Sequence, residues 1–344
     1  MPPIISTGCS MGDKILLAHG SGSKLSHDLV EKILTPPISN PILSRMDDSA
    51  VFQLSGKLAF TTDSYVVNPI FFPGGDIGRL AVCGTVNDLS MSGARPLFLS
   101  LSLIIEEGLE IEDLRRVVES IKNTADEARV QIVTGDTKVV NRGKADKLFI
   151  NTAGIGMVEE NVDISGSNAR PGDKIILSGG IGEHGIAVMS KREGLKFNIP
   201  VLSDCAPLNH LVVDMLEVSK NIHSLRDPTR GGLASTLSEF AIQSQVGIRI
   251  EEDRIPVHEG VRGVCELLGL DPLYIANEGK LVAAVAPRDA DRVLAVMKKN
   301  RYAAQAAIIG EVTEEHRGRV VMKTRIGAYR IVDLPVGEIL PRIC

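Results

Sequence analysis

The sequence predicts a two-domain protein of mixed helices and strands, whose second half is an α+β domain. With 344 residues, the chain is long enough for two domains of ordinary size. Its 44% hydrophobic and 24% charged residues are normal for a soluble globular protein. The second half mixes predicted strands and helices without regular βαβ alternation, which favours α+β over a doubly wound sheet. We therefore expect an arm, a first domain, a second domain and a mobile tail at 1–40, 41–167, 168–324 and 325–344.

The first half begins with an irregular arm and continues with strands and helices. Two apolar runs around Ser55-Gly56 predict a hairpin with strands at 49–54 and 57–62. A stripe of apolar or small residues predicts a helix over 75–94. The other elements expected here are helices over 26–34 and 112–129 and strands at 130–134 and 147–158.

The second domain begins after residues 168–173, where Pro171-Gly172 marks a boundary. A strand over 174–177 opens this domain. Helices are then expected near 207–222, 231–244, 260–268 and 289–300, and strands near 273–276, 281–286, 306–312 and 320–324.

Composition excludes several classes of function. The net charge is −5 and only 3% of residues are aromatic, so neither a phosphate-binding basic surface nor base-stacking side chains are indicated. No signal peptide and no run of transmembrane length is recognised. The five cysteines form no C-x-x-C pair, which fits a reducing cytoplasm better than a disulfide framework or a zinc site.

The last residue, Cys344, places a thiol on the end of the chain. A thiolate is a strong nucleophile, and Pro335, Gly337 and Pro341 prevent a continuous helix or central strand before it. Such a tail could carry its sulfur into a site and out again. The alternative is a frayed terminus without a role.

Four aspartates adjoin separate predicted elements: Asp48, Asp63, Asp88 and Asp136. Each alone fits a turn residue or a solvated helix position. Together they could supply oxygen ligands to magnesium ions that bridge phosphates, with Asn87 as a further oxygen and Lys138 as a point charge. The set therefore predicts an ATP site, although the chain has no P-loop.

Other motifs are weaker. Small residues in the stretch from His19 to Lys24 leave backbone N–H groups free to approach an anion, or form a flexible loop. The stretch 226–232 opens a helix with flanking cations and is a second candidate anion site. G-x-G-x-x-G at 180–185 lacks the strand that should precede Asp204 in a dinucleotide site, and G-x-S-x-G at 8–12 lies too close to the terminus for a nucleophile elbow.

The order of the motifs resembles the aminoimidazole-ribonucleotide-synthetase (PurM-like) superfamily over essentially the whole chain. Its terminal Pro341-Arg342-Ile343-Cys344 resembles one branch, the HypE carbamoyl dehydratases of hydrogenase maturation. The internal motifs that carry the resemblance are His19-Gly20-x-Gly22, Asp47-Asp48-x-Ala50, Thr61-Thr62-Asp63, the stretch 84–89, the stretch 135–138 and the stretch 227–232. One departure is Ser23, where many relatives have glycine.

The resemblance implies an N-terminal α/β domain whose sheet pairs with its mate in a homodimer, with ATP near that interface. It also implies a reaction. A carbamoyltransferase, HypF, loads a carbamoyl group on Cys344. ATP-dependent dehydration converts the resulting thiocarbamate to a thiocyanate, and the cyano group passes to a HypC-HypD scaffold complex that builds the nickel-iron centre.

Residue roles follow from the same resemblance. Glu278 or Lys138 would act as the base, and His19 with the Gly20 and Gly22 backbone would lie near the phosphates, beside Lys24. Asp63, Asn87 and Asp136 would bind the nucleotide and its metal. Two rivals remain open, a small-molecule ATP-dependent synthetase or kinase that does not need Cys344, and a non-catalytic carrier that does not need the carboxylates.

Overall fold

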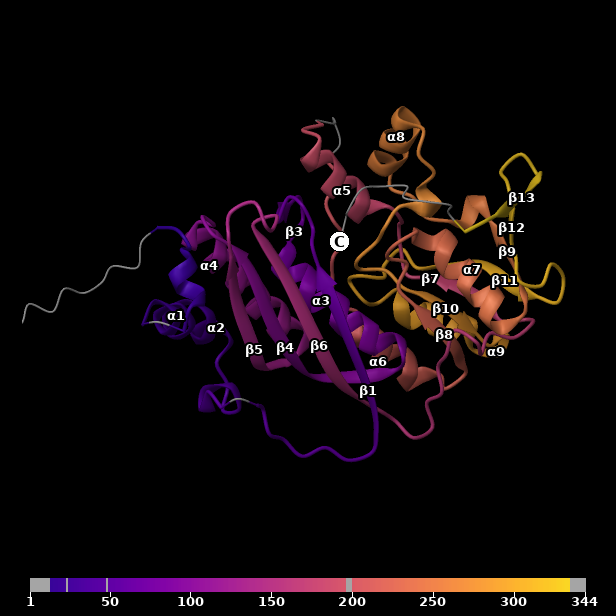
Figure 1. Ribbon diagram of the computed structural model, residues 1–344. Coiled ribbons are helices and arrows are strands. Elements are labelled where there is room, and N and C mark those ends of the chain that lie inside the picture. The colour runs from indigo at the N-terminus through magenta and orange to yellow at the C-terminus, as the bar shows by residue number, and fades with distance from the viewer. Residues whose placement is uncertain (1–12, 23, 48, 196–199, 335–344) are drawn as a thin grey trace, which may run out of the picture.

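The structure, a computed structural model, describes residues 13–22, 24–47, 49–195 and 200–334. It contains two domains side by side, each built on its own sheet (Figure 1). In the described ranges, no helix is both long and apolar enough to cross a membrane.

The N-terminal domain has a four-stranded sheet in the order β1-β6-β4-β5. Its strands are β1 (Lys57–Tyr65), β4 (Ala94–Glu106), β5 (Gln131–Val140) and β6 (Leu148–Val158). The β1–β6 and β4–β6 pairs are antiparallel, whereas β4 and β5 are parallel and are connected through α4 (Ile111–Ala128). With α3 (Ile77–Met91), α4 forms the helical layer that buries the inner face of this sheet. This confirms the predicted α/β domain.

The opposite face of the sheet carries apolar side chains that remain open. On β1, alternate residues point away from the helices, and Leu58 and Phe60 are 48% and 71% exposed. Their register partners on β6 are Met157 and Ile155. Ile104 on β4 is 41% exposed. Leu58 and Phe60, with Met157 and Ile155 beside them, form an apolar patch of the kind that marks interaction surfaces.

The N-terminal arm forms short helical turns that pack on α4 and along the edge strand β5 (Figure 1). Its elements are η1 (Leu17–Gly20), α1 (Lys24–Leu29), η2 (Val30–Leu34), α2 (Thr35–Ile38) and η3 (Leu43–Arg45). A small hairpin of β2 (Phe71–Phe72) and β3 (Gly75–Asp76) leads into α3, and the Asp76 side chain caps that helix by accepting hydrogen bonds from Gly78 N and Arg79 N.

The C-terminal domain has a seven-stranded sheet in the order β13-β12-β9-β11-β7-β10-β8, antiparallel except where β12 runs parallel to β9. Its strands are β7 (Lys174–Leu177), β8 (Ile222–Arg226), β9 (Gly247–Glu251), β10 (Val282–Val285), β11 (Ala307–Thr313), β12 (Val320–Lys323) and β13 (Tyr329–Val332). The domain is α+β, as predicted.

Helices cover both faces of this second sheet. One apolar cluster joins α6 (Asn209–Val218) and α9 (Pro287–Met297) to one face, and another joins α7 (Gly232–Ser244) to the other. A third, smaller cluster holds α5 (Glu183–Arg192) and α8 (Glu259–Leu268) together. The 3-10 turns η4 (Glu252–Arg254) and η5 (Pro272–Tyr274) connect these parts.

The two domains share α3. Leu89 and Met91 at the end of this helix belong to the same apolar cluster as Leu211 and Met215 of α6. Gly84, in the middle of α3, lies so close to the Tyr65 ring of β1 that an added Cβ would collide with it. The helix therefore packs tightly against its own sheet and against the other domain at once.

Several predicted elements differ from the structure. Residues 49–54 form no strand, so the predicted hairpin is wrong, and β1 is the edge strand of the described sheet, paired with β6 alone. Residues 273–276 form no strand, and the first two of them are the end of the turn η5. The strand predicted at 130–134 continues to Val140, so Asp136 lies within β5 and not past its end. Residues Tyr329–Val332, assigned to the tail, form β13.

Candidate active site

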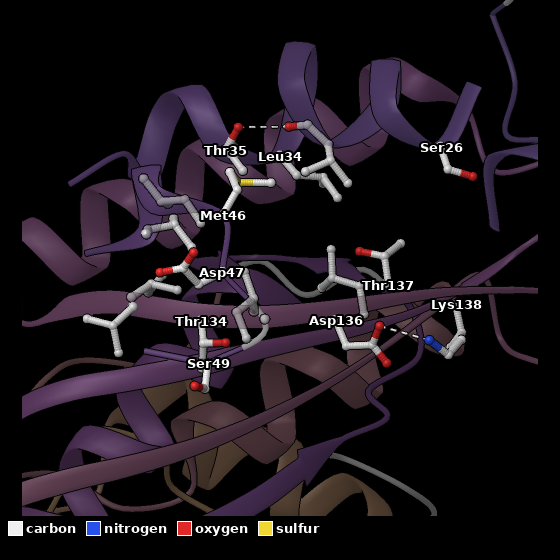
Figure 2. A pocket seen from close by; sticks show the side chains of 18 of the residues that line it. Ser26, Leu34, Thr35, Met46, Asp47, Ser49, Thr134, Asp136, Thr137 and Lys138 are labelled. Atoms are coloured by element: carbon white, nitrogen blue, oxygen red, sulfur yellow. Dashed lines mark hydrogen bonds and ion pairs between the residues drawn. The ribbon is translucent and has the colours of Figure 1, made fainter. Parts of the chain in front are cut away.

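A cavity of about 390 Å³ lies between the N-terminal arm and strand β5 (Figure 2). One end is apolar and is lined by Val30, Leu34, Ile38, Ile42, Leu43 and Met46 of the arm with Ile132 of β5. The other end is polar and includes His19, Gly20, Asp136 and Lys138. An apolar wall with a few convergent polar groups is the usual form of a small-ligand site.

His19 presents a free donor position to this cavity. Its ring is 2% exposed, and Nδ1 accepts a hydrogen bond from the Leu16 backbone N–H at 2.9 Å. An accepting Nδ1 in a neutral ring leaves the proton on Nε2, and Nε2 is buried without a partner in the described structure. A Cβ at Gly20 would meet the backbone of Val139 at 2.8 Å, so the loop approaches β5 as closely as glycine allows.

Asp136 and Lys138 project from β5 toward the polar end of the cavity (Figure 2). Their side chains form an ion pair at 2.8 Å and are 59% and 64% exposed. The hydrogen bond from Lys138 lowers the pKa of Asp136. Asp47, on the opposite wall, pairs with Arg45 at 3.0 Å. These exposed pairs are weak enough to exchange partners with a charged ligand.

A separate acidic cluster lies where β1 and α3 meet the second domain. Asp88 Oδ2 accepts a hydrogen bond from Thr61 Oγ1 at 2.9 Å. Burial raises the pKa of Asp88, and the neighbouring charge of Asp63 raises it further. The two aspartates therefore repel each other in a partly desolvated place.

Asp227 completes this cluster, and sequence reasoning missed its carboxylate. It follows β8 in the stretch that was interpreted as an anion site because of its cations. Burial, with the charges of Asp88 and Asp63, raises the pKa of Asp227 to about 7. The available signal was the position of an acidic residue between Arg226 and Pro228, immediately after a buried strand.

Glu278 adjoins the same cluster from the other side. It is 3% exposed in the turn after η5. Burial raises its pKa well above the ordinary value, and the charges of Cys205, Asp227, Asp204 and Asp63 act in the same direction. A buried carboxyl group with a raised pKa is typical of an acid–base catalyst.

Asn87 and Asp88 are neighbours on α3 and serve different partners. Asn87 Nδ2 donates to Ala206 O at 3.1 Å and to Glu278 O at 3.4 Å, and its Oδ1 accepts from Leu208 N at 2.8 Å. Both polar atoms of Asn87 thus hold the second domain, whereas Asp88 faces β1.

Comparison with known proteins identifies the family. Residues 46–158 match the family model described as AIR synthase related protein, N-terminal domain, and residues 170–323 match its C-terminal domain. The chain is 52% identical over 333 residues to carbamoyl dehydratase HypE of Rhizobium leguminosarum bv. viciae, covering 96% of this chain and 95% of that protein. The chain belongs to the HypE family of carbamoyl dehydratases. The predicted superfamily and branch are confirmed.

Solved HypE structures have the same fold. A crystal structure of HypE in complex with ATP is similar with a TM-score of 0.93 at 51% identity, covering 96% of this chain and 99% of that one. A chain of a HypE-HypF complex is similar with a TM-score of 0.80 at 48% identity, covering 91% and 100%.

Within this HypE-family chain, the predicted site residues fall into two groups. His19, Gly20, Gly22 and Asp136 with Lys138 line the cavity, and Lys24 is exposed at the start of α1. Asp63, Asp88 and Glu278 lie at the domain junction with Asp227. Asp48, Ser23 and Cys344 lie outside the described residues. Among the residues described, no three His, Cys, Asp or Glu side chains are arranged to hold a metal ion by themselves.

The raised pKa of Asp227 predicts a pH-dependent stability of the metal-free chain. A carboxyl group with a raised folded-state pKa stabilises below its unfolded pKa of about 4 and loses that contribution as the pH rises through about 7. We expect Asp227→Asn to stabilise the protein in EDTA by roughly 2 kcal/mol more at pH 8 than at pH 5. Urea unfolding at both pH values measures this.

Asp291→Asn, an exposed change on α9, controls for loss of one negative charge. An Asp227→Asn effect of equal size at pH 5 and pH 8 would contradict the assignment.

Proposed function

We propose that this chain is an ATP-dependent carbamoyl dehydratase that converts a thiocarbamate on Cys344 to a thiocyanate, supplying cyanide ligands for the nickel-iron hydrogenase centre. The observation that carries the proposal is the junction of Glu278 with the acidic cluster. Glu278, the proposed base, lies there beside the aspartates that would bind a cation and so offset the charge of the phosphates. Helix α3 contacts both through Asn87 and Asp88. Family membership and the relative solved with ATP support the same reaction.

The cavity suits a nucleotide. Its apolar end would take the base between the arm and β5, and the unpartnered His19 Nε2–H would donate to an anionic or carbonyl oxygen. The Gly20 and Gly22 backbone and Lys138 would contact the phosphates. ATP supplies the phosphoryl group that turns the amide oxygen of the carbamoyl group into a leaving group.

The acidic cluster suits magnesium only together with phosphate. Asp63, Asp88 and Asp227 offer hard oxygen atoms. Burial and the neighbouring carboxylate charges raise the pKa values of Asp88 and Asp227, and a bound cation would offset both effects. Magnesium commonly takes one or two carboxylates and completes its shell with substrate phosphates and water. Asp136, on the cavity side of the sheet, and Asp48 remain proposed as magnesium ligands, and Asn87 is assigned instead to the domain junction.

Glu278 is the better candidate for the base. Dehydration removes the oxygen and both hydrogens of the carbamoyl NH₂ group, so a group near the tail sulfur must accept a proton. Glu278 is enclosed at the junction, and a raised pKa makes its carboxylate a stronger base. Lys138 is exposed and paired with Asp136, which fits phosphate binding rather than proton abstraction.

The reaction needs partners. A carbamoyltransferase of the HypF type would load Cys344, as the solved HypE-HypF complex of a relative suggests. A HypC-HypD scaffold would accept the cyano group. Cys83, Cys205 and Cys265 are free thiols, which supports a reducing, cytoplasmic setting.

Two substitutions separate this reaction from its rivals. Cys344→Ala should bind Mg-ATP like the wild type in a calorimetric titration, yet lose all ATP turnover that depends on carbamoyl loading. Asp88→Asn should still accept the carbamoyl group but dehydrate it slower by on the order of 100-fold, because charge on the transferred phosphoryl group is left uncompensated.

A small-molecule synthetase or kinase would keep its activity in Cys344→Ala. A non-catalytic carrier would deliver its group undiminished in Asp88→Asn. Either result would reject the dehydratase.

We also propose that the open face of the first sheet forms a homodimer. Leu58, Phe60 and Ile104 supply an apolar surface of the kind that subunit interfaces cover. Phe60→Glu should convert a dimer to a monomer, because a charge would be desolvated at the interface. Light scattering after size exclusion measures the mass.

Ile326→Glu changes an apolar residue that is 90% exposed in the second domain and should leave the mass unchanged. A Phe60→Glu protein that remains dimeric would place the interface elsewhere.

A further inference from the structure

We propose that Asp204, held in place by Lys280, is the positioning residue that fixes Glu278 for proton abstraction. The inference rests on the proposed function, since it gives Glu278 its role. Sequence reasoning considered Asp204 only as the acidic residue of a dinucleotide motif, and the structure gives it a different place.

Asp204 caps the turn that carries Glu278. Its Oδ1 accepts a hydrogen bond from Glu278 N at 3.1 Å, and its Oδ2 accepts one from Gly279 N at 3.2 Å. One carboxylate therefore orients two consecutive peptide groups, including that of the base itself. Hydrogen bonds to a charged acceptor are stronger than neutral ones.

The approach between the two segments is as close as the backbone permits. A Cβ at Gly279 would collide with Asp204 O, so only glycine fits there. Ala206 N donates a hydrogen bond to Glu278 O at 3.4 Å, so the two segments each donate to and accept from the other. These contacts hold the turn against the segment 204–206.

Lys280 holds the Asp204 carboxylate. Its Nζ lies 3.3 Å from Asp204 Oδ2 and 3.0 Å from Glu183 Oε2. The side chains of Asp204 and Lys280 are only 1% and 10% exposed, so each compensates a charge that would be costly alone. Glu183 comes from the first turn of α5, which anchors the pair to a regular element.

Two asparagines hold the same turn from other sides but not at the Glu278 N–H. Asn277 Nδ2 donates to Pro228 O, and its Oδ1 accepts from Gly182 N. Asn87 donates to Glu278 O. Replacement of the Asp204 carboxylate should therefore leave the turn attached through the two asparagines. The orientation of the Glu278 side chain would no longer be fixed.

The environment leaves room for a matched substitution at Lys280. A cavity of about 700 Å³ opens beside Lys280, Glu183 and Asp204. An arginine at position 280 could extend into this space and keep its charge near both carboxylates, whereas methionine fills the position without charge.

The experiment uses the full-length chain, loaded with carbamoyl groups on Cys344, in single-turnover dehydration at varied ATP. Asp204→Asn should lower the maximal rate by about 100-fold with an unchanged half-saturating ATP concentration, because a small misplacement of the base slows chemistry but leaves the nucleotide cavity intact. Lys280→Met should act in the same way, and Lys280→Arg should restore most of the rate.

Asp173→Asn is the matched control. Asp173 is also a buried carboxylate that accepts a backbone N–H, from Arg170 at 2.8 Å, and pairs with His223 at 2.8 Å. It precedes β7 at the end where Lys174 pairs with Val285, whereas Glu278 precedes the other end of β10. Asp173→Asn should leave both constants unchanged. Equal rate losses in Asp173→Asn and Asp204→Asn, or a wild-type rate in Asp204→Asn or Lys280→Met, would overturn the positioning role. A wild-type chain that never dehydrates its tail would instead reject the proposed function.

Discussion

The constraint on which the rest of the structure depends is the enclosure of helix α3 between the two domains. Its flank near Gly84 lies against Tyr65 of β1, and its last turn packs into the apolar cluster of α6. Consecutive residues of a helix point about 100° apart. Asp88 therefore meets Thr61 of the first domain while Asn87 binds the loop and the Glu278 turn of the second. A single helix thus sets the distance between the acidic cluster and the proposed base.

The acidic cluster and Glu278, where we place the reaction, are arranged in a way that destabilises the folded protein. Asp88, Asp227 and Glu278 lie together near Asp63, and burial, with the repulsion between these like charges, raises the pKa values of Asp88, Asp227 and Glu278. Such an arrangement persists only where surrounding packing and ion pairs offset it. The cations Arg226 and Arg230 provide part of that compensation at Asp88. Binding of a cation and phosphates would change this balance in the direction that the reaction needs.

Hydrophobic periodicity in the sequence predicted many of the helices and strands. Contacts between segments far apart in the sequence could not be predicted in this way. The stripes on α3 and α4 and the apolar run of β7 are local signals, and the structure confirms them. The central strand β4 was not assigned, although Leu99, Leu101, Leu103 and Ile105 alternate in it as a half-buried strand requires. Residues 49–54 have a strand-like composition but do not pair with β1, whose outer edge stays unpaired in the described sheet. The meeting of Asp227 with Asp88 and the capping of Glu278 by Asp204 join distant segments, so no local pattern could reveal them.

The measurement that tests the central claim most directly is the mass of the C-terminal peptide after incubation with ATP, magnesium, carbamoyl phosphate and an active carbamoyltransferase. Dehydration of a carbamoyl group to a cyano group removes one water from the adduct on Cys344. The account predicts a carbamoyl adduct without ATP hydrolysis and a cyano adduct when ATP is hydrolysed. A tail that stays unmodified, or keeps its carbamoyl group while ATP is consumed, would contradict it.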